Sequence, residues 1–165
     1  VDALMKLLVQ YLKSEVKELH KNNVILKVLG DITELPYQCE KEIEDAIELT
    51  KDNDGLTLNV AFNYGGRNEI IRAVKNIIKD VERNKIELES IDEKKFNDYL
   101  YTNGIPDTDL IVRPSGEQRI SNFLLWQCAY SEFWYSNINW PDFNEQDLRK
   151  AVYDYQNRNR RYGGV

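Results

Sequence analysis

The chain has 165 residues, of which 42% are apolar and 30% are charged, so it is long enough for one domain with a sizeable core and short for two. Its 22 basic and 28 acidic residues give a net charge of −6, which argues against nucleic acid as a partner and requires any anion site to be a local basic pocket. No apolar run reaches the roughly 18 to 20 residues that span a bilayer, and no signal-peptide pattern is present. We therefore expect a single cytoplasmic domain over residues 1–165, at most peripheral to a membrane.

The first segment carries apolar residues at spacings of three and four, which predicts a long helix that ends near residues 22 and 23. A β-branched and aliphatic run over residues 24–29, closed by Gly30, predicts a buried strand. A second helix is predicted from Pro36 to Thr50, with the proline in its first turn. The apolar stripe of the first helix consists of Leu4, Leu7, Leu8, Tyr11, Leu12, Val16 and Leu19.

The next strand is predicted over residues 56–63, where apolar and polar side chains alternate. It leads into the turn Gly65-Gly66 and a helix for which Asn68 is the natural cap. The remaining predicted elements are a short helix after Asp92, a strand over 109–113, a helix from Phe123 to about Tyr130 capped by Ser121 or Asn122, a strand over 133–138 and a final helix that begins at Asn144.

Strands separated by helices are typical of an α/β fold with a parallel central sheet flanked by helices, in which ligands gather at the carboxyl ends of the strands. The strand that ends at Arg113 leads into a loop with two arginines, two serines and a glycine. Arginine and serine donors suit phosphate oxygens, and the free N–H groups of a helix after Ser121 would add a positive dipole end. A second interpretation remains open, in which Arg119 pairs with Glu117 and Ser121 only caps the helix.

These residues form longer motifs that resemble a known family. The segment 109–132, Asp-Leu-Ile-Val-Arg-Pro-Ser-Gly-Glu-Gln-Arg-Ile-Ser-Asn-Phe-Leu-Leu-Trp-Gln-Cys-Ala-Tyr-Ser-Glu, and the segment 139–143, Asn-Trp-Pro-Asp-Phe, closely resemble the C-terminal signature of cis-prenyltransferases. So do residues 56–67, Leu-Thr-Leu-Asn-Val-Ala-Phe-Asn-Tyr-Gly-Gly-Arg, and 160–164, Arg-Arg-Tyr-Gly-Gly. The resemblance implies an Mg²⁺-dependent condensation of isopentenyl diphosphate with farnesyl diphosphate, which makes undecaprenyl diphosphate for bacterial peptidoglycan synthesis.

The resemblance also implies roles for individual residues. Glu132 matches the acidic magnesium ligand of the family. The hydrophobic tunnel for the growing chain is matched by Leu4, Leu7, Leu8 and Leu56, for which plain core packing is an equally good interpretation. The substrate-binding residues implied by the resemblance are Arg113, Arg119, Ile120 and Ser121, with Arg161 and Gly163 completing the isopentenyl site across the interface of a homodimer.

Two departures from the family pattern are visible. Pro114 stands where the family usually has threonine, and proline removes one backbone N–H from the loop. The family's Asp-Gly-Asn motif, which carries the catalytic aspartate, does not occur among the 165 residues. The resemblance therefore predicts a domain truncated at its N-terminus, a fold without the N-terminal strands and a chain that is inactive alone.

Two other functions compete with this one. A non-catalytic partner subunit of a heteromeric cis-prenyltransferase would also lack the aspartate, but such subunits tend to lose the loop from Arg113 to Ser121 that this chain keeps. The second alternative is a nucleotide-binding α/β domain. Only Gly65-Gly66 favours this assignment, and these glycines lack the G-x-G-x-x-G spacing. The sequence therefore favours the prenyltransferase.

Overall fold

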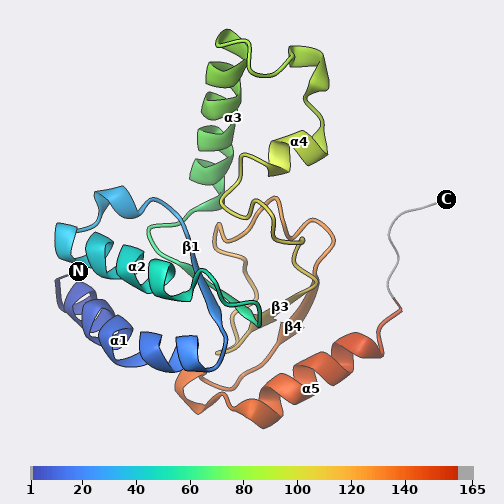
Figure 1. Ribbon diagram of the computed structural model, residues 1–165. Coiled ribbons are helices and arrows are strands. Elements are labelled where there is room, and N and C mark those ends of the chain that lie inside the picture. The colour runs from blue at the N-terminus through green and yellow to red at the C-terminus, as the bar shows by residue number, and fades with distance from the viewer. Residues whose placement is uncertain (1, 160–165) are drawn as a thin grey trace. The chain divides into compact units, whose positions relative to one another are not determined.

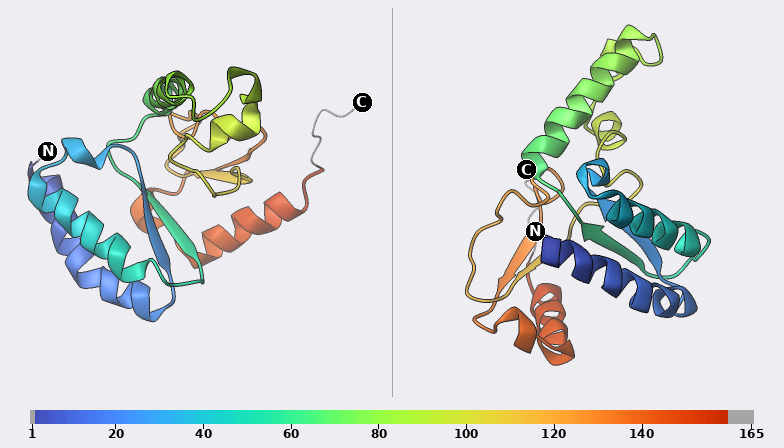
Figure 2. Two further views of the ribbon diagram at one scale, coloured as in Figure 1. Left: turned by 45° about the horizontal axis from the view of Figure 1, so that its top comes forward. Right: turned by 90° about the vertical axis from the view of Figure 1, so that its left-hand side faces the viewer.

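The computed structural model describes the backbone of residues 2–159 and the side chains of residues 7 and 9–159. The chain forms two compact units, Val1–Asn103 and Gly104–Val165. Figure 1 and Figure 2 show the helices and strands of each unit. None of the helices in this described part has the length and apolar character that a membrane-spanning helix needs.

The first unit contains two parallel strands joined by a helical crossover. β1 and β2 pair with Ile25 opposite Thr57 and Leu29 opposite Ala61. The helices and strands predicted for this part of the chain are confirmed, with small shifts at their ends. They are α1 (Asp2–Lys21), β1 (Ile25–Leu29), α2 (Tyr37–Thr50), β2 (Thr57–Ala61), α3 (Gly66–Glu82) and α4 (Glu93–Asn97), with short 3-10 turns at Ile32–Glu34 and Leu88–Ser90.

The core of the first unit lies where α1 and α2 pack against each other and against β1. Each helix has one apolar face because its apolar residues recur every three or four positions. Full burial of one aliphatic side chain contributes about 1.5 to 3 kcal/mol. The Thr50 hydroxyl lies inside this core, where it accepts a hydrogen bond from the backbone N–H of Leu26 at 3.0 Å. The buried residues of this core are Leu12, Leu26, Ile43 and Ala46.

Gly30, immediately after β1, lies against the end of β2. Its φ angle is +120°, and a Cβ atom at this position would lie 1.9 Å from the carbonyl oxygen of Phe62. Only glycine fits here, because it has no side chain and tolerates positive φ. The two parallel strand ends are therefore held in close contact.

The second unit also contains a parallel strand pair, β3 (Leu110–Arg113) and β4 (Glu132–Tyr135). A 3-10 turn at Trp140–Asp142 leads to α5 (Glu145–Gln156). The predicted start of this helix is confirmed: Asn144 is its N-cap and forms a capping box with Asp147. Because such a box satisfies backbone N–H groups at the first turn, it defines where the helix begins.

Three predictions, one of a helix, one of a strand end and one of a helix cap, are wrong. The segment 114–131 joins β3 to β4 by turns and contains no helix, because Ser121, Asn122 and Leu124 have φ angles of +52°, +63° and +47°, whereas an α-helix requires negative φ. The last strand ends at Tyr135 instead of residue 138. Asn68 does not cap α3, because Gly65 occupies the N-cap position.

The predicted α/β class with parallel strands and flanking helices is confirmed. The described strands are hydrogen-bonded as two separate pairs, β1 with β2 and β3 with β4. Each pair has its carboxyl ends at one edge, so the residues that follow each strand are placed together. These strand ends carry the candidate site residues.

Candidate functional site

Arg113 is the last residue of β3 and lies opposite Tyr135 of β4. Its backbone carbonyl accepts a hydrogen bond from the N–H of Ser136 at 3.1 Å, which continues the ladder beyond the strand. The side-chain Nε of Arg113 is buried and has no hydrogen-bond partner in the described part of the chain. A buried donor without a partner costs about 1 to 3 kcal/mol. An anion that reached this atom would recover that free energy.

The loop after Arg113 is fixed to the segment that follows β4. The N–H of Ser115 donates to the carbonyl of Ile138, and the N–H of Gly116 donates to the carbonyl of Ser136, both at 2.8 Å. The Ser115 hydroxyl accepts from the N–H of Trp140 at 3.3 Å. Gly116 has a φ angle of +69°, a conformation that glycine adopts without strain. The first turn of the loop therefore has a defined conformation.

Arg119 lies further along this loop and forms an ion pair with Glu117, with 2.5 Å between Nη1 and Oε2. The pairing of Arg119 with Glu117, which was the second interpretation of the sequence, is therefore found in the structure. The side chain of Arg119 is 69% exposed, and an exposed pair of this kind contributes at most about 1 kcal/mol. A diphosphate, which offers more negative charge than one carboxylate, could replace Glu117 at low cost.

Ile120 and Ser121 follow without forming a helix. Ile120 is partly buried and Ser121 is exposed, with Ser121 in a left-handed conformation. The predicted contribution of a helix dipole at Ser121 is therefore wrong. The loop can offer an anion only its side-chain donors and the N–H groups of its turns.

Glu132, the predicted metal ligand, is the first residue of β4. Its Oε2 accepts from Nη1 of Arg158 at 2.6 Å, and the two side chains are 31% and 33% exposed. Among the described side chains there is no group of three or more His, Cys, Asp or Glu that could hold a metal ion. Arg161 and Gly163 lie outside the described residues. Glu132 is thus a single partly buried carboxylate with an arginine already bound to it.

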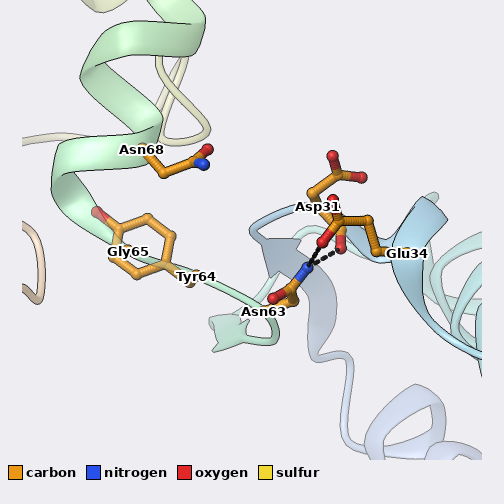
Figure 3. A pocket seen from close by; sticks show the side chains of 6 residues that line it. All are labelled: Asp31, Glu34, Asn63, Tyr64, Gly65 and Asn68. Atoms are coloured by element: carbon orange, nitrogen blue, oxygen red, sulfur yellow. Dashed lines mark hydrogen bonds between the residues drawn. The ribbon is translucent and has the colours of Figure 1, made fainter.

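A second set of polar residues lies at the carboxyl ends of β1 and β2 in the first unit. Asn63 donates through Nδ2 to the backbone carbonyl of Asp31 at 3.0 Å and to Oε2 of Glu34 at 2.9 Å. Figure 3 shows this amide pointing toward Asp31 and Glu34, with Tyr64 and Asn68 beside α3 across from it. The cavity they surround has a volume of about 180 Å³ and is lined by Asp31, Glu34, Asn63, Tyr64, Gly65 and Asn68.

The Asp31 carboxylate is fixed by the turn that follows it. The hydroxyl of Thr33 donates to Oδ1 at 2.6 Å and the N–H of Thr33 donates to the same oxygen at 3.1 Å. These bonds, the hydroxyl first, lower the pKa of Asp31 below its usual value of 3.8. The first unit therefore presents an ionised carboxylate at this cavity.

Sequence reasoning missed Glu69, which has no exposed surface. Its carboxylate accepts hydrogen bonds from the hydroxyl of Tyr64 at 2.6 Å and from the backbone N–H of Tyr101 at 2.8 Å. The guanidinium of Arg72 lies 3.8 Å from the centre of the Tyr101 ring, a cation–π contact. A glutamate in the first turn of a helix is usually exposed to solvent, so nothing in the sequence indicated that Glu69 is buried in this cluster.

The residues predicted to line a tunnel are only partly described. Leu7 is 60% exposed and Leu56 is 72% exposed, so these two do not pack in the core of their unit. The side chains of Leu4 and Leu8 lie outside the described ones. Their role in a tunnel stays a prediction.

Parallel strand pairs with flanking helices, and a strand-end loop rich in arginine and serine, define an α/β protein with the composition of a phosphate-binding site. Comparison with known families gives a closer placement. The chain belongs to the prenyltransferase family whose model is described as "Putative undecaprenyl diphosphate synthase", which matches residues 1–163.

Individual relatives agree with this placement. The chain is 62% identical over 165 residues to the isoprenyl transferase of Clostridium perfringens and 48% identical to that of Bacillus thuringiensis. It spans about 65% of the length of the curated relatives it matches. A crystal structure of lavandulyl diphosphate synthase from Lavandula x intermedia, in complex with dimethylallyl diphosphate, is 37% identical with a TM-score of 0.94, and the match covers 99% of this chain and 71% of that one.

A second solved structure, described as a probable undecaprenyl diphosphate synthase from Campylobacter jejuni, is 34% identical with a TM-score of 0.86. The match covers 99% of this chain and 74% of that chain. The fold described above is therefore the fold of this family over nearly all of the residues present.

Proposed function

We propose that this chain carries the isopentenyl diphosphate and metal half of a cis-prenyl chain-elongating transferase. The reaction condenses isopentenyl diphosphate with an allylic diphosphate, farnesyl diphosphate, and its product is undecaprenyl diphosphate for peptidoglycan synthesis. Family membership and the isoprenyl transferases among the relatives support the reaction class. The observation that carries the assignment is Arg113, whose buried Nε has no partner among the described residues and which begins a loop containing Arg119.

The reaction explains why such a loop is useful. The carbon–oxygen bond of the allylic diphosphate breaks, and its electron pair leaves with the diphosphate. The double bond of isopentenyl diphosphate then attacks the allylic carbon, and a proton leaves the new product. Arg113, Arg119 and the Ser121 hydroxyl would hold the isopentenyl diphosphate, so that its double bond stays in line with that carbon. Ile120 would pack beside it.

The residues of this chain fit a magnesium ion that is held jointly by Glu132 and the substrate phosphates. Mg²⁺ is usually bound by one or two carboxylates together with substrate phosphates and water, so one glutamate is sufficient. Glu132 is partly exposed and only its Oε2 takes part in the bond to Arg158. When bound, Mg²⁺ neutralises the charge that develops on the leaving diphosphate. Glu132 would supply one oxygen ligand.

The remaining parts of the proposal concern the whole protein. We propose a homodimer in which Arg161 and Gly163 complete the isopentenyl site of the neighbouring copy. The protein would work in the cytoplasm and deliver its lipid product to the membrane by peripheral contact. Residues 1–165 alone would not turn over, because the Asp-Gly-Asn motif of the family does not occur in them.

The test uses the full-length protein with radiolabelled isopentenyl diphosphate, farnesyl diphosphate and Mg²⁺. We expect chain-extended product, and we expect Arg113→Gln to raise the KM for isopentenyl diphosphate. Product that forms only after a second subunit is added would identify a non-catalytic partner subunit. If the full-length protein extends no allylic diphosphate with or without a second subunit, the proposed function is wrong.

A further inference from the structure

The carboxyl end of α5 is attached to the β3–β4 pair by three side-chain contacts. Each joins a residue in or just after the last turn of α5 to a residue in or next to a strand. The contacts are Asp154 with Nε1 of Trp134 at 2.8 Å, the Tyr155 hydroxyl with Asp109 at 2.8 Å, and Arg158 with Glu132 at 2.6 Å. Two of these contacts would remain if the third were broken, so α5 does not depend on Arg158 to stay in place.

The contact between Arg158 and Glu132 differs from the other ion pairs in the described part of the second unit. Glu117 with Arg119 and Glu145 with Arg149 are local pairs on strongly exposed arginines. Arg158 and Glu132 are 26 residues apart, and about a third of each side chain is exposed. Partial burial strengthens the attraction between the charges, whereas the remaining exposure lets an ion from solvent reach the carboxylate.

Arg158 and a magnesium ion would compete for the same carboxylate. Mg²⁺ binds oxygen at about 2.0 to 2.1 Å, so a metal on Glu132 would lie within a few ångströms of the guanidinium, and the two positive charges would repel each other. Arg158 therefore opposes metal binding as long as it stays on Oε2. A diphosphate that arrives with the metal offers Arg158 another anion, because guanidinium donors suit phosphate oxygens.

We infer that Arg158 is the exchangeable counter-ion of Glu132: it occupies the carboxylate in the absence of metal and leaves it when Mg²⁺ and a diphosphate bind. This inference depends on the proposed role of Glu132 as metal ligand. Its consequence is that Mg²⁺ alone binds weakly.

The experiment is a calorimetric titration of the full-length protein with magnesium chloride alone, with no substrate present. We expect Arg158→Gln to bind Mg²⁺ roughly two- to fivefold more tightly than the unchanged protein, which corresponds to the strength of a partly exposed ion pair. Arg158→Lys keeps the charge and should bind Mg²⁺ as the unchanged protein does. Arg149→Gln is the matched control, because it removes an arginine of α5 whose partner, Glu145, lies on α5 itself and not on a strand.

Equal or weaker Mg²⁺ binding by Arg158→Gln would overturn the inference, because Arg158 would then not compete with the metal. Glu132→Gln separates this failure from a failure of the proposed function. If Glu132→Gln loses Mg²⁺ binding while Arg158→Gln gains none, only the role of Arg158 is wrong. If Glu132→Gln binds Mg²⁺ as before, the metal assignment of Glu132 is wrong as well. Circular dichroism of each variant checks that the fold is retained.

Discussion

The hydroxyl of Tyr64 donates a hydrogen bond of 2.6 Å to Glu69, a carboxylate without exposed surface. The other carboxylate oxygen of Glu69 accepts from the backbone N–H of Tyr101. Tyr64 follows β2, whereas Tyr101 follows α4 in the chain. This one side chain therefore joins the glycine turn before α3 to the end of the first unit.

Replacement of Glu69 by alanine should lower the free energy of unfolding by about 3 kcal/mol, because two partly buried donors would lose a fully buried acceptor. Urea denaturation followed by circular dichroism measures this loss. Glu82→Ala is the control, since Glu82 is the exposed last residue of α3 and its removal should change stability by no more than about 0.5 kcal/mol. Equal stability of the two variants would contradict the structural role of Glu69.

Gly30 and Gly104 allow a comparison between a clash and backbone strain alone. Gly30→Ala would place Cβ 1.9 Å from the Phe62 carbonyl oxygen, whereas a Cβ at Gly104, where φ is +74°, would meet nothing within 4 Å among the described residues. We expect Gly104→Ala to cost about 1 to 2 kcal/mol from the left-handed backbone and Gly30→Ala to cost clearly more. Thermal unfolding of both variants tests the order, and a smaller loss for Gly30→Ala would refute the close strand contact.

Thr33→Val should raise the pKa of Asp31 toward its usual value of 3.8, because the hydroxyl bond is the largest cause of the lowered pKa. A carboxyl whose folded pKa is lowered stabilises the protein fully above its unfolded pKa, and this contribution is lost as the pH falls through the folded pKa. Titration of the Asp31 carboxyl carbon by NMR below neutral pH measures the shift. Asp80, whose pKa is lowered mainly by Lys85, should titrate unchanged in the same sample, and an unchanged Asp31 titration would contradict the assignment.

Arg119→Gln should weaken the binding of isopentenyl diphosphate by roughly ten- to a hundredfold, since hydrogen bonds to charged groups contribute about 1.5 to 3 kcal/mol. Stability should change by less than about 1 kcal/mol, because the pair with Glu117 is exposed. Isothermal titration of the full-length protein measures the affinity. Arg149→Gln, whose side chain is 77% exposed, should leave the affinity unchanged, and equal affinities in the two variants would exclude Arg119 from the site.

The parts of the fold that follow from local patterns were predictable. The helix predicted from the spacing of the first apolar residues and the cap predicted at Asn144 both depend on residues close together in the sequence, and both predictions are confirmed. The prediction of a helix over residues 123–130 is wrong, because a run of apolar residues can also be buried by a series of turns. Nothing in the sequence indicates that Leu124 has a positive φ angle.

In the candidate site, too, some features could be predicted from local sequence patterns and others could not. The position of Arg113 at a strand end could be predicted from the strand pattern and is confirmed. The partner of Glu132 could not, because Arg158 is 26 residues away in the sequence and meets it only when α5 folds back on the strands. Glu69 was missed for a related reason, since its burial depends on Tyr101, far along the chain.

The two parallel strand pairs differ in how their strands are connected. α2 lies between β1 and β2, whereas residues 114–131 connect β3 to β4 without a helix. A helix can form locally and shorten the chain before the strands meet, but an irregular segment must lose its conformational entropy in one step as the loop closes. We therefore expect the β1–β2 pair to form early in folding and the β3–β4 pair late, so that the arginine loop is among the last parts of the protein to become ordered.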